Sequence, residues 1–217
     1  MVVLWAQVAA AQTENDLGIA AADVPPAPSE EKEEEVDWSF SASVLGYLVP
    51  DDRDFAQPTF RADRDWLHLE ARYNYEELNT GSAWVGFNFD FSFDEELTFE
   101  FTPMIGGVFG ELNGVAPGYE GTLSWWKLEL YTEGEYLIEV DDRSDNFFYT
   151  WSELSLSPLD WFRFGLVVQR TKAYETDLDI QRGFLVGLSY EPVDFTAYVL
   201  NLGWDTPTVV LSLGVEF

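Results

Sequence analysis

The side chains best able to do chemistry in this chain are charged residues that recur at every second position of an extended stretch. The stretch LHLEARY places His68, Glu70 and Arg72 on one face of an extended strand, because successive side chains of a strand point to opposite faces. A histidine beside a carboxylate and a guanidinium could serve hydrolysis, hold a metal ion or form ion pairs. The other residues of the chain decide among these three uses.

The chain offers little support for catalysis or for metal binding. It contains one histidine and no cysteine, which excludes thiol chemistry and disulfides. A serine hydrolase would need His68 near a serine and a third orienting residue, and the sequence has no His-x-Ser motif. A zinc site at His68 would have to depend on carboxylates. We therefore predict no enzymatic activity, no metal and no cofactor, with a lipid-modifying enzyme as a remote alternative.

Further charged residues lie on the polar face of their own predicted strands, as Arg72 does, and most of them are acidic. The chain carries 40 Asp and Glu against 11 Lys and Arg, a formal net charge of −29. This balance argues against nucleic acid as a partner, because its phosphates would be repelled. We expect Arg72 to pair with Glu70 or Glu100, and Lys127 with Glu129. The candidates for lining an interior and setting its ion selectivity are His68, Glu70, Arg72, Glu100, Glu120, Lys127, Glu129, Glu133, Glu153 and Arg163.

The elements that must position these residues are predicted to be strands. From residue 38 onward, apolar and polar residues alternate with a period of two almost everywhere. The predicted strands cover residues 38–48, 55–62, 66–75, 82–93, 97–109, 115–124, 127–140, 147–156, 161–171, 180–190, 193–200 and 206–217.

The apolar face of these strands is expected to meet lipid. Aromatic residues are 17% of the chain, yet no apolar run approaches the ~18 residues of a spanning helix. The remaining way to cross a bilayer is a closed barrel, because every backbone polar group must be paired inside the protein. Short turns alternate with longer or more polar loops, as at the two ends of such barrels, and the short turns are expected at 63–65, 93–95, 125–126, 157–160 and 191–192. The predicted fold is therefore an all-β, 12-stranded antiparallel transmembrane up-and-down β-barrel over residues 38–217, with a soluble sandwich or barrel as the alternative.

Aromatic residues gather near the short turns. Placed on the apolar face, they would form an interfacial girdle. They are Trp38, Trp66, Phe93, Trp125, Phe162, Tyr190, Phe195 and Phe217.

The last predicted strand, TPTVVLSLGVEF, has a pattern that is found in a known class of proteins. One face of it presents Val209, Leu211, Leu213, Val215 and Phe217, and the chain ends on the aromatic residue. Such a strand resembles the closing strand of bacterial outer-membrane β-barrel proteins of the porin-like class. The resemblance implies the outer membrane of a Gram-negative-type bacterium, with a lipopolysaccharide outer leaflet. It also implies that this strand carries the signal recognised by the barrel-assembly machinery. Closure requires the last strand to pair with the first, at residues 38–48.

Two segments precede the predicted barrel. Residues 1–11, MVVLWAQVAAA, are apolar and end in small residues, which indicates the remnant of a signal peptide. Residues 12–37 combine prolines with an acidic run, a composition typical of disorder, so we expect a disordered acidic periplasmic leader.

The polar face then defines the lumen, and its acidic excess suggests a function. A negative field in a confined lumen concentrates cations. The sequence therefore predicts a narrow cation-preferring channel for ions or small solutes. A non-conducting structural or surface-interaction barrel, with its interior filled by paired charges, is the alternative.

Overall fold

The computed structural model describes residues 37–50, 53–93, 96–140, 146–173 and 178–217. The predicted signal remnant at 1–11 lies outside the described residues, as does the predicted leader at 12–37 except for its last residue. None of the described residues forms a helix with the length and hydropathy needed to cross a bilayer.

Thirteen strands make up the described part of the chain, and each pairs antiparallel with its neighbours. Their bounds are β1 Ser39–Leu48, β2 Phe55–Arg64, β3 Leu67–Tyr73, β4 Thr80–Phe87, β5 Phe89–Ser92, β6 Leu97–Gly110, β7 Gly114–Trp125, β8 Leu128–Glu139, β9 Phe147–Leu159, β10 Phe162–Ala173, β11 Asp179–Tyr190, β12 Val193–Leu200 and β13 Thr208–Glu216.

These strands close into a ring. β4 and β5 are separated only by Asn88 and both pair with β6, so together they occupy one place and the ring has twelve positions. The last strand pairs with the first over eight residues, from Ser41 opposite Glu216 to Leu48 opposite Val209. Beyond that ladder, Phe40 and Phe217 exchange two backbone hydrogen bonds of 3.0 and 2.9 Å. The predicted closure and the twelve-stranded antiparallel barrel are confirmed, because β4 pairs with both β3 and β6 and β13 pairs with β1.

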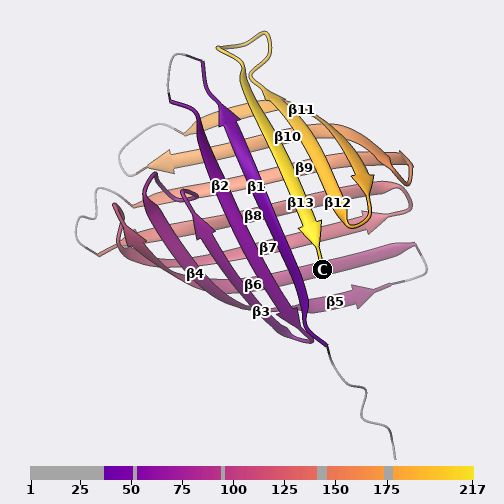
Figure 1. Cartoon of the computed structure of the whole chain (residues 1–217), viewed down its shortest axis with the longest axis horizontal. Coiled ribbons are helices and arrows are strands. Elements are labelled where there is room, and N and C mark those ends of the chain that lie inside the picture. Colours follow the sequence, from indigo (N-terminus) through magenta and orange to yellow (C-terminus); the bar gives the residue numbers. More distant parts are fainter. Residues whose placement is uncertain (1–36, 51–52, 94–95, 141–145, 174–177) are drawn as a thin grey trace, which may run out of the picture. The chain divides into compact units, whose positions relative to one another are not determined.

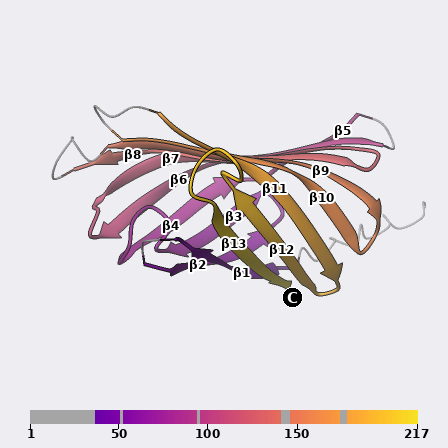
Figure 2. The same cartoon turned by 90° about the horizontal axis from the view of Figure 1, so that it is seen from above.

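The barrel has two opposed walls. Figures 1 and 2 show β1, β2 and β13 crossing over β7, β8 and β9, with the other strands curving between the two walls. Side chains that point inward from one wall therefore face those of the other across the lumen.

The distribution of side chains between the two faces is the reverse of that in a soluble protein. Glu70 and Arg72 are 4% and 6% exposed, whereas Phe87 and Leu213 are 51% and 50% exposed. Large apolar side chains on the outside and charged ones on the inside are what a bilayer around the barrel requires. The apolar residues that do point inward form two clusters, one around Trp84 and Met104 and one around Trp151 and Tyr198.

Several strand bounds differ from the sequence prediction. The turn predicted at 157–160 is shorter and begins later, because β9 continues to Leu159 and the chain turns at Asp160 and Trp161. The strand predicted at 82–93 is interrupted at Asn88, between β4 and β5. The predicted strand 66–75 is too long: β3 ends at Tyr73, and Asn74 adopts a left-handed φ of 57°. This turn brings Tyr75 into the barrel instead of leaving it on the outer face with Tyr73.

Glycines on β6 and β7 make room for an inward-pointing tryptophan. A Cβ on Gly106 would clash with the middle of the Trp84 indole ring, and one on Gly118 would lie 2.9 Å from it. The indole cannot easily withdraw, because its Nε1 donates a 3.0 Å hydrogen bond to Ser82. Gly106 therefore provides close packing of the side chain against the wall.

This packing predicts different effects for two adjacent glycines. We expect Gly106→Ala to lower the free energy of unfolding by ~1–3 kcal/mol, because it overpacks a filled interior. Gly107→Ala should change it little, since Gly107 points outward and has no atom within 4 Å of an added Cβ. Urea unfolding of the refolded barrels, followed by tryptophan fluorescence, measures both. Equal stability of the two variants would contradict the packing argument.

Candidate functional site

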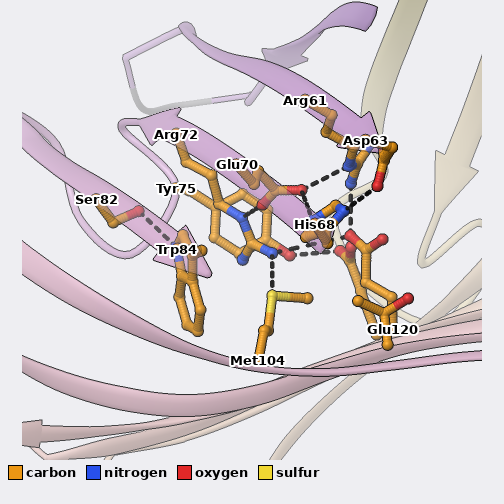
Figure 3. Close-up of polar contacts among 12 residues, drawn as sticks. Arg61, Asp63, His68, Glu70, Arg72, Tyr75, Ser82, Trp84, Met104 and Glu120 are labelled. Atoms are coloured by element: carbon orange, nitrogen blue, oxygen red, sulfur yellow. Dashed lines mark hydrogen bonds and ion pairs between the residues drawn. The ribbon is translucent and has the colours of Figure 1, made fainter. Parts of the chain in front are cut away.

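Arg72 is the centre of the polar network inside the barrel. Its Nε donates a hydrogen bond to Glu70 Oε1, and its Nη1 donates one of 3.0 Å to Glu135 Oε2 on β8. The guanidinium carbon lies 4.3 Å from the centre of the Tyr75 ring and 4.6 Å from that of Trp84. Figure 3 shows the guanidinium of Arg72 beside Glu70, Tyr75 and Trp84. Carboxylates on two sides and aromatic rings on two others compensate the burial of the charge.

A second arginine extends the network along β2. Arg61 Nε donates a 2.5 Å hydrogen bond to Glu70 Oε2, and its Nη2 donates one of 2.6 Å to Glu120 Oε1 on β7. Each oxygen of Glu70 therefore accepts from a different arginine. His68 lies beside this pair, with its Nδ1 2.8 Å from Asp63 Oδ1. The network thus connects β2 and β3 to β7 and β8.

Tyrosines carry the network further across the lumen. The Tyr75 hydroxyl donates to Glu133 Oε1, and the Tyr131 hydroxyl donates a 2.7 Å hydrogen bond to Glu133 Oε2. Tyr75 lies in the loop between β3 and β4, outside the strands, as does Glu76. Burial raises the pKa of the Tyr75 hydroxyl and that of the Glu76 carboxyl.

A separate cluster surrounds Arg163 on β10. Its Nη2 donates to Thr196 Oγ1 at 2.7 Å and to Asp194 Oδ1 at 3.3 Å, and its Nη1 lies 3.8 Å from Glu153 Oε2. Glu153 also accepts hydrogen bonds from Trp151 Nε1 and the Tyr198 hydroxyl, at 2.7 and 2.8 Å. The positive charge of Arg163 is therefore shared between two carboxylates.

Two cavities occupy the part of the lumen that these clusters leave. The turn-side cavity has a volume of about 410 Å³ and is bordered by Glu129, Glu133, Glu153, Asp194 and Glu216, together with Arg61 and Arg163. The loop-side cavity has a volume of about 390 Å³ and is bordered by Phe55, Glu76, Glu77, Leu112, Phe147, Gln169 and Thr171.

Four side chains border both cavities and form what we call the collar. They are Tyr47, Gln57, Tyr75 and Tyr149. Tyr75 and Tyr149 meet edge to face with ring centres 5.4 Å apart, and Gln57 Nε2 donates a 2.9 Å hydrogen bond to Asn74 O beside them. The collar is therefore the set of side chains that the two cavities share.

The structure places eight of the ten predicted lumen residues in three different settings inside the barrel. His68, Glu70, Arg72, Glu120 and Glu133 belong to the Arg72 network. Glu153 and Arg163 form the second cluster, and Glu129 borders the turn-side cavity. The expected Arg72–Glu70 pair is present.

The other two predicted lumen residues lie near the short turns. Lys127 is exposed, and its Nζ donates a 2.7 Å hydrogen bond to Pro158 O, where a pair with Glu129 was expected. Glu100 is exposed, opposite Asp90 in the β5–β6 ladder, where a pair with Arg72 was one of the expectations.

Some features of the site could not be predicted from the sequence. Alternation places Glu135 on the inward face, but only the structure shows that it binds Arg72 across the lumen. Tyr75 and Glu76 enter the lumen from a loop, where strand alternation gives no signal. Asn74, a residue that tolerates a left-handed φ, was the one local hint that the strand ends there.

One group of possible metal ligands is present in the described part of the chain. Atoms of His68, Glu70 and Glu120 lie within 4.8 Å of one another. Arg61 already contacts both carboxylates, so a metal ion would have to displace its guanidinium. The group is better suited to holding Arg61 than to holding a metal.

The central ion pairs should dominate the stability of the barrel interior. We expect Arg72→Ala to lower the free energy of unfolding by ~3–5 kcal/mol, because Glu135 would remain buried without its cation. Lys127→Ala serves as the matched control, and we expect little change because that charge is exposed at a turn. Equilibrium unfolding of the refolded proteins measures both. Similar stabilities would show that Arg72 is not an organising residue.

The comparisons with known proteins concern the fold. No protein-family model and no curated protein sequence matches the chain. Among solved structures, the KdgM porin superposes with a TM-score of 0.54 and 11% identity, covering 82% of this chain and 98% of that protein. The NanC porin gives a TM-score of 0.51 with 13% identity, covering 81% and 98%. A second structure, of the KdgM porin in complex with disordered oligogalacturonate, gives a TM-score of 0.51. The chain therefore has the twelve-stranded barrel fold seen in these porins.

Proposed function

We propose that this protein is a narrow, cation-preferring channel for ions or small solutes in the outer membrane of a Gram-negative-type bacterium. The observation that carries the proposal is the charge that borders the two cavities. Seven carboxylates border them: Glu76, Glu77, Glu129, Glu133, Glu153, Asp194 and Glu216.

The bordering cations do not cancel this charge. Arg61 and Arg163 are the two basic residues among the described residues that border the cavities. Each is already engaged by two carboxylates. The remaining negative field, enclosed by a low-dielectric wall, would concentrate cations and repel anions.

The outer surface supports the proposed location. Large apolar side chains are exposed around the closed barrel, and aromatic residues are exposed near the short turns, including Trp66 at 52%, Trp125 at 57% and Phe217 at 68%. Such an arrangement fits a bilayer with aromatic side chains at one interface. Recognition of the closing strand by the barrel-assembly machinery and contact with a lipopolysaccharide leaflet belong to the same proposal.

The proposed solute differs from the one named for the KdgM complex. Oligogalacturonate is a polyanion, and the carboxylates bordering these cavities would repel it. Although the folds are similar, we do not propose oligogalacturonate as a solute of this barrel.

A non-conducting barrel is the second candidate, and the ion pairs inside the lumen favour it. The paired charges of Arg72 and Arg163 fill part of the lumen, as that alternative requires. A lipid hydrolase has less support, because His68 is 3% exposed inside the barrel and contacts Asp63 rather than a serine on the outer wall. Lipid turnover that disappears in His68→Ala would revive it.

Selectivity in planar bilayers tests the channel. In a KCl gradient, we expect the reversal potential of the wild-type protein to have the sign of a cation-selective pore. The double substitution Glu129→Gln and Glu216→Gln removes two charges from the turn-side cavity and should move this potential toward zero. Glu100→Gln, exposed and outside both cavities, should change it less. An anion-selective wild type would refute the proposal.

The collar gives a second prediction, for conductance. We expect Tyr75→Ala to raise the single-channel conductance, because it removes a ring that borders both cavities. Tyr73→Ala is the matched control, since Tyr73 is two residues away but 47% exposed on the outer face. A wild type that is silent while Tyr75→Ala conducts would favour the non-conducting barrel.

A further inference from the structure

The loop-side cavity contains an acidic side chain that makes no well-formed hydrogen bond. Glu76 follows Tyr75 in the loop between β3 and β4 and is 9% exposed. Both of its carboxylate oxygens are buried and neither forms a hydrogen bond of good geometry with a described residue, while the Ser82 hydroxyl gives the charged carboxyl some stabilisation. Gln169 borders the same cavity, and its Oε1 is likewise buried without a partner. Buried acceptors of this kind are uncommon and call for a ligand or another compensation.

The loop that carries Glu76 is held firmly in place. Asn74 N donates a 2.8 Å hydrogen bond to Thr80 O, and Asn74 Oδ1 accepts one of 2.8 Å from Asn79 N. Asn74 Nδ2 also donates a 3.0 Å hydrogen bond to Ala56 O on β2. The position of Glu76 is therefore determined by the fold of the loop.

The nearest positive charge does not neutralise Glu76. Arg72 acts on Glu76 through its field, but its hydrogen bonds go to Glu70, Glu135 and Met104. The other described residues that border the loop-side cavity include no lysine and no arginine. Its described border thus offers acceptors and negative charge without an opposing cation.

Aromatic rings form much of the remaining wall. Tyr47 and Phe55 stack with ring centres 4.6 Å apart and an interplanar angle of 6°. Tyr75, Tyr149 and Phe147 complete the aromatic border. Aromatic faces attract organic cations and also pack against hydrocarbon, whereas a bare divalent metal ion would need about six oxygen ligands.

From this combination we propose that the loop-side cavity binds a small organic cation with a protonated primary amine, and that Glu76 is its counter-ion. The ammonium group has three donors for the acceptor oxygens, and its hydrocarbon chain packs against the aromatic rings. The cavity volume of about 390 Å³ suits a ligand of that size. This inference rests on the proposed function, because it names the class of solute that the channel recognises.

Calorimetric titration of the full detergent-solubilised protein tests the site, with 1,4-diaminobutane as the probe and 1,4-butanediol as its neutral analogue. We expect the diamine to bind and the diol not to. Glu76→Gln should weaken diamine binding about tenfold or more, because it removes a charge-assisted hydrogen bond from a buried site.

Glu111→Gln is the matched control for this experiment. Glu111 lies in the loop between β6 and β7, at the same end of the barrel, and loses the same charge on substitution, but it is exposed and is not among the described residues that border the cavity. We expect it to leave the affinity within about twofold, as surface charges contribute little. Equal weakening in both variants, binding of the diol, or no binding of the diamine would overturn the proposal.

A second variant keeps the test decisive if Glu76→Gln does not refold. Phe55→Leu removes one face of the Tyr47–Phe55 stack while keeping the charge of Glu76, and it should weaken diamine binding about threefold or more. Unchanged affinity would count against the site.

The titration requires no conduction, so the two proposals can fail separately. Glu76-dependent diamine binding by a barrel that is silent in bilayers would remove the channel and leave the binding site. Cation conduction without diamine binding would remove the binding site and leave the channel.

Discussion

The interior of this barrel depends on the need to compensate one buried guanidinium. Removing Arg72 from water is costly, and the cost is offset only where carboxylates and aromatic faces surround the charge. Glu70 comes from the same strand, β3, Glu135 from β8, and Trp84 and Tyr75 from neighbouring segments. Trp84 reaches its place because Gly106 and Gly118 have no side chain there. One charge thus ties β3 to β8 across the lumen.

Because this network fills one side of the lumen, it determines where space remains. The network is built on β2, β3, β4, β6, β7 and β8, while most residues around the turn-side cavity come from β1, β8, β9, β10, β12 and β13. The free lumen is therefore displaced toward β1 and β9–β13, and its charge is what remains after Arg61, Arg72 and Arg163 have been paired. The interior is acidic because its carboxylates outnumber the arginines that pair with them, and the net charge of the whole chain matters less.

The sequence was sufficient for the fold and insufficient for the site, for a physical reason. Alternation is a local property of each strand, so it located all twelve strand positions, the closure by Phe217 and the inward side of Arg72. Which inward side chains meet depends on the register and on the separation of opposite walls, so the partnership of Arg72 with Glu135 could not be derived. Tyr75 was placed on the wrong face because a single left-handed residue, Asn74, ends the strand before it.

The fold depends on the outward side chains and the backbone, whereas the site depends on the inward side chains. This division explains why similar barrels can have different chemistry. The outer face and the backbone ladders satisfy the bilayer whatever residues point inward, so the fold is compatible with identities of only 11–13% to the KdgM and NanC porins. The inward residues are free to differ as long as their charges are compensated. Here Arg72 is paired with two carboxylates, whereas Glu76 is carried into the lumen by a loop without a cation bound to it. An uncompensated group held by a rigid loop is the place where a barrel of common design can acquire a ligand of its own.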